Sequence, residues 1–194
     1  MSGQNDISKT ADIACEFFEV IIHNILYVRK LYPHQIFKKT KKYGTVVYQL
    51  IHPEVRDYIT KCLKAIHFYL KSNCLKTICI CILTKDHIIE RYLFNLLHIQ
   101  NNVEDLYISL EQSFHDFCLK LHINSNKLDE LPDEATFIIN LCVSEYNSVE
   151  FNENNDFAWI QVNLKELPKA EVVPMYSIDT STLKIQSYIE KIQN

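Results

Sequence analysis

Apolar residues recur at helical spacing between Ala11 and the proline at position 33, and one stripe of polar positions interrupts them. This is the pattern of a helix that is buried on most of its circumference. Ser8 or Thr10 is expected to cap its start, because short polar side chains accept hydrogen bonds from the first backbone N–H groups. Pro33 is expected to prevent its continuation. The polar stripe consists of Asp12, Glu16, Glu19, His23, Tyr27 and Lys30.

The middle of the chain predicts strands and two further helices. A run that is apolar on both faces, at 75–83, is typical of a central strand. The second helix is indicated by a proline in its first turn and by an amphipathic stripe. The predicted elements are a strand at 45–51, a helix at 53–71, strands at 75–83 and 88–97, a helix at 103–121 and a strand at 135–144.

The last part of the chain is less regular. Residues 146–156 are polar and predict a loop, and short extended or helical pieces are expected around 181–192. Three helices against a largely antiparallel sheet form an α+β architecture. We expect a single domain over residues 1–194, with a core at about 11–145 and a C-terminal segment at about 146–194.

Composition and charge limit the classes of function that the sequence supports. With 194 residues, 47% of them hydrophobic, the chain is long enough for one compact core. The net charge of −4 and the pI of about 6.1 argue against general nucleic-acid affinity. The N-terminal sequence lacks the features of a signal peptide, and charged or polar residues break every long apolar run, so a soluble intracellular protein is expected. One basic run, residues 38–42, is either a solvated hairpin tip or a phosphate contact within a larger DNA-bound assembly.

The seven cysteines are expected to be free thiols, because no CxxC pair and no zinc-finger spacing is present. Cys15, Cys62, Cys118 and Cys142 fall on predicted core faces, and Cys79 with Cys81 falls on one face of a strand.

Recognisable catalytic chemistry is missing from the sequence. Two glycines, Gly3 and Gly44, cannot form a phosphate-binding or dinucleotide-binding loop. The sequence contains no GxSxG or HExxH motif, and its acidic residues are not paired. We therefore expect no enzyme activity, no cofactor and no metal, although a cysteine-dependent or acid/base enzyme is the alternative of a different class.

Several motifs resemble those of HORMA domains. The motif residues are CEF at 15–17, ILYVRKLYPHQIF at 25–37, KYG at 42–44, HPEVRDYI at 52–59, DFAWI at 156–160 and IQSYIE at 185–190. Within that family the chain is most similar to the branch of accessory subunits of the translesion DNA polymerase zeta. The resemblance implies a HORMA-like fold whose C-terminal segment closes over a bound peptide as a safety belt.

The resemblance also implies a function and its residues. The chain would be an adaptor without catalysis, located in the nucleus, with a cytoplasmic location left open. A proline-containing peptide of the catalytic subunit would contact Tyr58, Trp159 and Tyr32. The C-terminal domain of a Y-family translesion polymerase would contact a second surface at Val172, Gln186 and Tyr188. No tight direct nucleic-acid binding and no membrane contact are implied.

Other interpretations of these residues stay open at this point. Trp159 and Tyr58 are also compatible with ordinary core packing, and both suit a binding hot spot. His115 occupies a position that is arginine in relatives and mediates pairing between HORMA domains, so self-association is doubtful. The alternative function within the fold is a spindle-checkpoint adaptor that binds a peptide of a cell-cycle regulator. Relatives of this branch also serve in other DNA-repair and cell-cycle assemblies.

Overall fold

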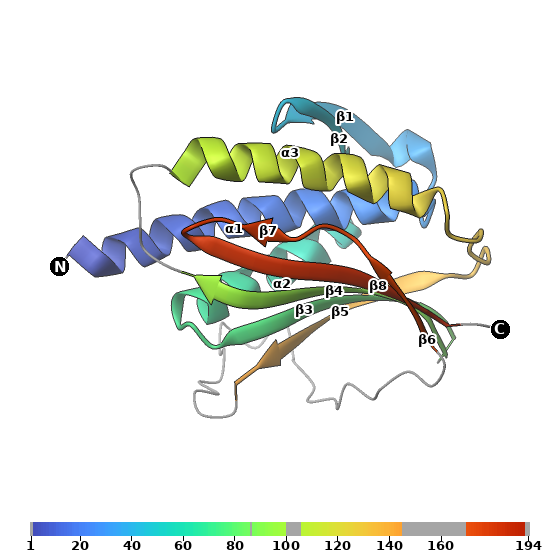
Figure 1. Cartoon of the computed structure of the whole chain (residues 1–194). Helices are drawn as coiled ribbons and strands as arrows, with labels where there is room; N and C mark the ends of the chain where they lie inside the picture. The colour runs from blue at the N-terminus through green and yellow to red at the C-terminus, as the bar shows by residue number, and fades with distance from the viewer. Residues whose placement is uncertain (1, 86, 100–105, 145–169, 193–194) are drawn as a thin grey trace.

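The computed structural model describes residues 2–85, 87–99, 106–144 and 170–192 (Figure 1). In chain order the elements are α1 (Ser2–Val28), the short 3-10 helix η1 (His34–Ile36), β1 (Phe37–Lys42), β2 (Thr45–Leu50), α2 (Pro53–Lys71), β3 (Leu75–Thr84), β4 (His87–Ile99), α3 (Leu106–Ser125), β5 (Thr136–Val143), β6 (Ala170–Pro174), β7 (Ile178–Asp179) and β8 (Leu183–Ile192).

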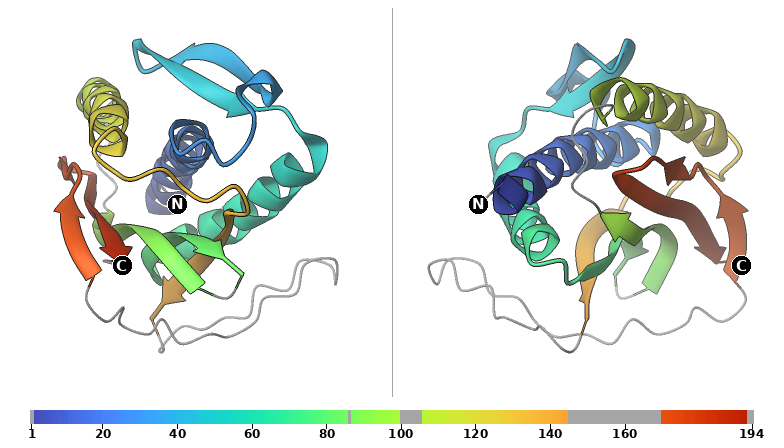
Figure 2. Two further views of the ribbon diagram at one scale, coloured as in Figure 1. Left: turned by 90° about the vertical axis from the view of Figure 1, so that its right-hand side faces the viewer. Right: turned by 60° about the vertical axis from the view of Figure 1, so that its left-hand side comes forward.

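The described elements form three layers. The six-stranded sheet lies on one side, the helices cover one face of it, and the β1–β2 hairpin lies on the other side of the helices (Figures 1 and 2). In the left view of Figure 2, α1 is enclosed by α2, α3, the hairpin and the sheet. The predicted α+β architecture is confirmed.

The sheet has the strand order β5-β3-β4-β8-β6, and β7 also pairs with β8. All of these pairings are antiparallel. The sequence predicted only short extended or helical pieces near the C-terminus, which was wrong. Residues 183–192 form one long strand that pairs with β4 on one side and with β6 on the other, because Leu183, Ile185 and Ile189 alternate with polar residues and face the core.

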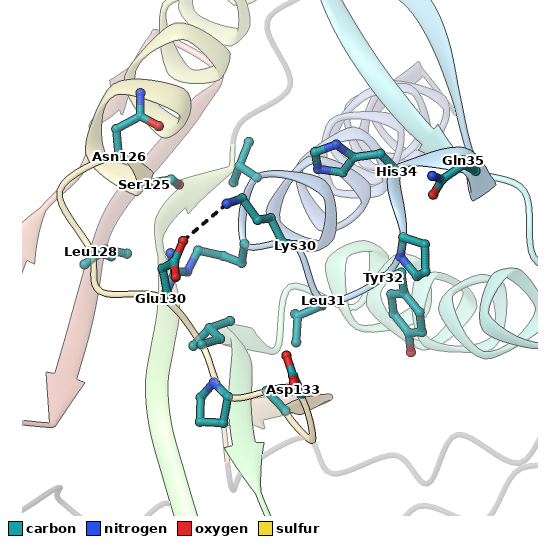
Figure 3. Close-up of a pocket in the computed structure, with 16 residues that line it drawn as sticks. Lys30, Leu31, Tyr32, His34, Gln35, Ser125, Asn126, Leu128, Glu130 and Asp133 are labelled. Atoms are coloured by element: carbon teal, nitrogen blue, oxygen red, sulfur yellow. Dashed lines mark ion pairs between the residues drawn. The ribbon is translucent and has the colours of Figure 1, made fainter.

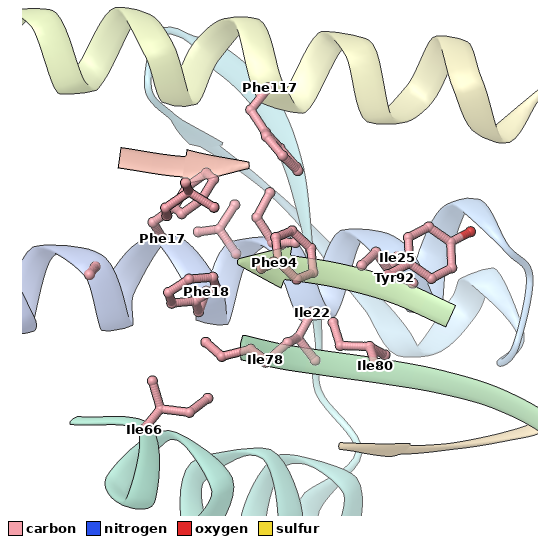
Figure 4. Packing of buried hydrophobic residues seen from close by; sticks show 14 of the residues in the cluster. Phe17, Phe18, Ile22, Ile25, Ile66, Ile78, Ile80, Tyr92, Phe94 and Phe117 are labelled. Carbon is pink, nitrogen blue, oxygen red and sulfur yellow. The ribbon is translucent and has the colours of Figure 1, made fainter. Parts of the chain in front are cut away.

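The core is built around α1 (Figure 4). The ring of Phe17 stacks on that of Phe114 in α3, with centroids 4.0 Å apart and an interplanar angle of 11°. Phe18 meets Phe94 of β4 edge to face, with centroids 5.8 Å apart. These contacts join the helical layer to the sheet, and they bury the apolar positions that the periodicity identified.

Helix α1 differs from the prediction at both ends. It begins at Ser2, well before the expected caps at Ser8 and Thr10, and it ends at Val28, before Pro33. Lys30 ends it, because this residue takes a left-handed conformation with φ 55°. The N–H of Leu31 then bonds to the carbonyl oxygen of Leu26, as in a common helix C-terminus.

The predicted polar stripe of α1 is partly buried. His23 is only 3% exposed and accepts the N–H of Leu50 at its Nδ1 atom, 3.3 Å away. Its neighbour Asn24 accepts the N–H of Tyr48 at 3.3 Å. The hairpin therefore covers this side of the helix, and these two side chains bind the inner edge of β2. Burial lowers the pKa of His23 to about 4, and the charge of Arg56 lowers it further.

Smaller corrections concern the hairpin, α3 and one cysteine. The four lysines of residues 38–42 lie along strand β1, and the turn is formed by Tyr43 and Gly44, which both have positive φ. Helix α3 extends to Ser125, four residues beyond the predicted end. All seven cysteines are free thiols, but Cys142 is exposed, because it lies on the edge strand β5 and its side chain points to the sheet face opposite the helices.

Candidate functional site

Strand β5 forms one edge of the six-stranded sheet, and among the described residues it pairs only with β3. On its outer side, Ile139 donates its backbone N–H to the hydroxyl oxygen of Tyr58, with 3.0 Å between the two atoms. Because backbone groups alternate in direction along a strand, Phe137 and Leu141 present their N–H and C=O groups to the same side. This edge has the geometry to pair with an added strand.

Aromatic side chains from two other elements flank this edge. The ring of Tyr58, from α2, lies 5.6 Å from that of Phe137 at an interplanar angle of 77°. The ring of Tyr32, from the segment after α1, lies 6.4 Å from Phe137 at 86°. Both are edge-to-face contacts, which aromatic rings favour. The structure thus brings two of the three predicted peptide-binding residues to Phe137, whereas Trp159 lies outside the described residues.

Both tyrosines stay protonated at neutral pH. Burial raises the pKa of Tyr58 and of Tyr32. A protonated phenol both donates and accepts hydrogen bonds, whereas a phenolate only accepts them. The two hydroxyl groups therefore suit contacts with the backbone of an extended peptide.

A pocket of about 750 Å³ lies beside the start of β5 (Figure 3). The end of α1, the end of α3 and the loop before β5 form its walls, and Tyr32 and Ala135 connect it to the β5 edge. Figure 3 shows Lys30 and Glu130 as an ion pair in this pocket, with 3.5 Å between nitrogen and oxygen. The pocket extends the surface that is available to a ligand on β5.

Arg29, one of the residues that line this pocket, forms a buried ion pair. Arg29, 6% exposed, binds Glu90 of β4 through two hydrogen bonds of 3.0 and 2.8 Å, and it also donates to the carbonyl oxygen of Asp129 at 2.6 Å. Burial raises the pKa of Glu90, and the charge of Arg29 opposes that rise. Sequence reasoning missed the role of Arg29, although this residue lies within the motif at 25–37. Its partner is 61 positions away, so no local pattern indicated the contact.

The second predicted surface lies on the C-terminal strands. Gln186 and Tyr188 point to the same side of β8, and Val172, 56% exposed, lies beside them on β6, opposite Glu190. These residues line a depression of about 440 Å³. The structure therefore brings the three predicted residues together, on the sheet face opposite the helices. Strands β3 and β4 separate this surface from β5.

His115 has an internal contact. Its Nδ1 atom lies 2.9 Å from the carbonyl oxygen of Tyr43, in the turn of the hairpin. The histidine is half-buried and connects α3 to this turn, next to Gly44. The predicted link between His115 and self-association stays a prediction.

Within the ranges that the structure describes, no group of three or more His, Cys, Asp and Glu side chains is arranged to hold a metal ion. Among the described helices, none is long and apolar enough to cross a membrane.

A sheet edge that is unpaired among the described residues and lies beside aromatic side chains is an arrangement typical of domains that bind extended peptides. The chain belongs to the HORMA family, because the family model described as HORMA domain matches residues 11–181. It is 31% identical over 190 residues to the human protein named mitotic spindle assembly checkpoint protein MAD2B, covering 93% of this chain and 90% of the relative. It is 26% identical to DNA polymerase zeta subunit 2 of Drosophila melanogaster, covering 92% and 96%.

Solved structures support the fold. A chain in the crystal structure of the mitotic checkpoint complex superposes with a TM-score of 0.82 at 22% identity, covering 95% of this chain and 99% of that one. C. elegans HTP-2 bound to HTP-3 closure motif 1 gives a TM-score of 0.78 at 14% identity, covering 95% and 87%.

Proposed function

We propose that this protein is a non-catalytic adaptor subunit of the translesion DNA polymerase zeta and works in the nucleus. It holds a proline-containing peptide of the catalytic subunit and bridges to the C-terminal domain of a Y-family translesion polymerase. The observation that carries the proposal is the outer edge of β5, where Ile139 meets Tyr58 beside Phe137. The names of the fruit-fly relative and of the Arabidopsis thaliana relative, DNA polymerase zeta processivity subunit, support the assignment of the complex.

Peptide binding uses the backbone of β5. An added strand gains main-chain hydrogen bonds from Phe137 and Leu141, and the neighbouring aromatic rings select its side chains. At Ile139 the Tyr58 hydroxyl already occupies the N–H group. The ligand must therefore displace this hydroxyl or interrupt its own pairing at that point. A proline in the ligand is compatible with such an interruption, because proline does not continue regular strand pairing.

The topology leaves room for a C-terminal belt. Strands β5 and β6 lie at opposite edges of the sheet, so the chain between Val143 and Ala170 connects the two edges. With strands about 4.8 Å apart, these edges are roughly 19 Å from each other. The connecting segment can extend to roughly 85 Å, which leaves enough chain to enclose a peptide. The predicted belt and C-terminal segment cover about 146–194. Residues 146–169 and 193–194 of it lie outside the described residues, and 170–192 contain β6, β7 and β8.

Bridging requires that both partners bind at the same time. The peptide would occupy the β5 edge, and the Y-family domain would occupy the surface of Val172, Gln186 and Tyr188. Strands β3 and β4 lie between the two sites, so neither ligand excludes the other. The depression around Tyr188 offers an apolar anchor point within a polar rim, as small interfaces often do.

A spindle-checkpoint adaptor is the second candidate. The observation in its favour is that the chain is 28% identical to mitotic spindle checkpoint component MAD2 of Saccharomyces cerevisiae, covering 97% of this chain and 98% of that protein. Such an adaptor would use the same β5 edge with a different peptide. The HPEVRDYI motif at 52–59, which includes Tyr58, favours the polymerase assignment.

The experiment is a binding competition on the purified chain. Peptides of the polymerase zeta catalytic subunit and of checkpoint regulators are titrated separately by calorimetry. We expect the polymerase peptide to bind at least tenfold more tightly. A tighter checkpoint peptide would reverse the order of the two candidates, and binding of neither peptide would refute the adaptor function. A pull-down that lists the bound proteins provides an independent test.

A further inference from the structure

Two cysteines of β3 lie side by side on the sheet face opposite the helices. The Sγ atoms of Cys79 and Cys81 are 3.5 Å apart, and neither side chain is exposed. They form a small second core with Leu93 of β4, against which Tyr188 of β8 packs. The two sulfurs are thus close enough for an oxidant to join them as a disulfide, provided that they approach each other by roughly 1.5 Å.

Two polar side chains distinguish Cys81 from Cys79. Asn140 of β5 donates from its side-chain nitrogen to the Cys81 sulfur at 3.4 Å. Arg91 is the cross-strand neighbour of Cys81 on β4, and it pairs with Glu190 at 3.4 Å. A cationic guanidinium and an amide donor both stabilise negative charge on sulfur.

The protonation of the pair follows from these contacts. The side-chain hydrogen bond with Cys79 and the charge of Arg91 lower the pKa of Cys81, and burial opposes this shift. The same hydrogen bond, together with burial, raises the pKa of Cys79. Cys81 is therefore the thiol of the pair that ionises more readily, and Cys79 is its protonated neighbour, which is the division of roles in a dithiol redox pair.

We propose that Cys79 and Cys81 form a reversible redox site that a small hydroperoxide oxidises to a disulfide. The Cys81 thiolate attacks one peroxide oxygen, the O–O bond breaks, and the departing hydroxide takes up a proton to become water. Cys81 is then a sulfenic acid. The Cys79 sulfur attacks it, the S–O bond breaks, and a second water leaves with the Cys79 proton. Overall, two thiols and one hydrogen peroxide give one disulfide and two waters, and an added dithiol restores the thiols.

The burial of the two sulfurs limits the size of the oxidant, and the geometry of β3 determines what a disulfide would change. Since both sulfurs are inaccessible to bulky reagents, the oxidant must be small. Residues two apart in a strand have Cα atoms roughly 6.7 Å apart, near the upper limit for a disulfide, and the sulfurs must approach to about 2.05 Å. The bond would therefore pull on β3 and change the contact between Asn140 and the Cys81 sulfur. Because Asn140 lies on β5, oxidation should weaken peptide binding, a consequence that rests on the proposed function.

Peptide mapping tests the site without any partner. Trypsin releases residues 77–85 with both cysteines and no other, because Lys76 and Lys85 flank them. The reduced full chain is treated with increasing hydrogen peroxide, alkylated in denaturant and digested, and the peptide is weighed. We expect an internal disulfide, reversed by dithiothreitol, at peroxide concentrations that leave the exposed Cys142 largely alkylatable. Oxidation of Cys142 while 77–85 keeps two alkylatable thiols would overturn the proposal.

Single substitutions test the assigned roles. In Cys79→Ser, Cys81 should still react with peroxide, and its sulfenic acid should be trapped by dimedone that is added together with the denaturant. In Cys81→Ser, Cys79 should remain alkylatable. The reverse pattern would overturn the assignment of the nucleophile. Cys142→Ser is the matched control and should form the 77–85 disulfide as the wild type does. Since the mass measurement requires no peptide ligand, its failure is distinguishable from a failure of the proposed function. The oxidised chain should bind the polymerase peptide at least fivefold more weakly, and an unchanged affinity would refute the effect on β5.

Discussion

The backbone N–H of Ile139 is bound by the hydroxyl of Tyr58, a residue 81 positions earlier in the chain. The contact joins helix α2 to the one edge of the sheet that is suited to accept a peptide. The hydroxyl provides a hydrogen-bond partner for the Ile139 N–H on the outer side of β5. A strand bound at this edge would have to interrupt its regular pairing at Ile139. Tyr58 is therefore a residue whose ring and hydroxyl can be tested separately.

Tyr58→Ala should weaken binding of the catalytic-subunit peptide by about 2 kcal/mol, the size of a hot-spot loss. Tyr58→Phe should weaken it by less than about 1 kcal/mol, because the ring contact with Phe137 remains. Calorimetry measures both affinities, and thermal unfolding checks the fold. Lys64→Ala, an exposed position on the same helix, is the control and should bind as the wild type does. A Phe variant as weak as the Ala variant would mean that the hydroxyl, not the ring, carries the contact.

The second surface should be separable from the first. Replacing Gln186 and Tyr188 together by alanine should abolish measurable binding of the Y-family domain and leave peptide affinity within about twofold, since β3 and β4 separate the sites. Val172→Ala should give a smaller loss. Titration of each partner against each variant provides the measurement. If the double variant lost both partners equally, the chain would not be a bridge with two independent sites.

The buried ion pair of Arg29 and Glu90 should contribute far more to stability than the exposed ion pair of Lys30 and Glu130. Arg29→Met should lower the free energy of unfolding by about 3–5 kcal/mol, because it leaves an uncompensated carboxylate in the core. Arg29→Met combined with Glu90→Leu should lose less than the sum of the single changes. Lys30→Ala, which breaks the exposed pair with Glu130, is the matched control and should cost about 0–1 kcal/mol. Urea unfolding measures the free energy of unfolding of each variant. If Arg29→Met and Lys30→Ala lowered it by similar amounts, the core would tolerate the unpaired Glu90 carboxylate.

Acid should destabilise the fold through His23. In the unfolded chain this imidazole takes up a proton near pH 6.5, but in the folded protein it does so only near pH 4. Between these values the unfolded state binds more protons, so stability falls as the pH falls. The full loss is about 3 kcal/mol. His23→Gln should be less stable at pH 7.5 but should show a smaller decrease between pH 7 and pH 4.5. An identical pH dependence in both proteins would exclude His23 as the cause, and His34→Gln, at an exposed position, is the control.

The basic strand should contribute little to DNA binding. Lys38 and Lys42 point to one face of β1 and Lys39 and Lys41 to the other, and Lys42 pairs with Glu16. The four charges therefore cannot follow one phosphate backbone. We expect the isolated chain to bind labelled DNA with a dissociation constant of roughly 10⁻⁵ M or weaker at physiological salt. Replacing all four lysines by glutamine should change this by less than threefold; tight binding that falls steeply with salt would instead favour direct nucleic-acid recognition.

Local patterns predicted most of the elements. The helical spacing of residues such as Phe17 and Phe114 identified α1 and α3, and the alternation around Phe137 identified β5. The same alternation was present in 183–192, where Leu183, Ile185 and Ile189 face the core. It was not recognised as a strand, because serine and lysine interrupt the apolar positions and no local feature reveals that β4 is the partner.

The remaining features depend on contacts between distant residues. His23 continues the polar stripe of its helix, so its sequence context indicated exposure. It is buried because a hairpin more than twenty residues later folds over it. The pairing of Arg29 with Glu90 and the contact of Tyr58 with Ile139 depend in the same way on the assembled fold. The depression at Gln186 and Tyr188 exists only because β6 returns beside β8.

The two edges of the large sheet are not equivalent. Strand β6 is only five residues long, ends in Pro174 and carries the exposed Glu171, and short edges with proline and charge resist pairing with other strands. Strand β5 is longer, and its outer donors and acceptors can be used. If both edges were receptive, copies of the chain could join edge to edge into an endless fibre. With one receptive edge, strand addition would stop after a single event, so the peptide binding proposed for β5 would not lead to polymers of the chain.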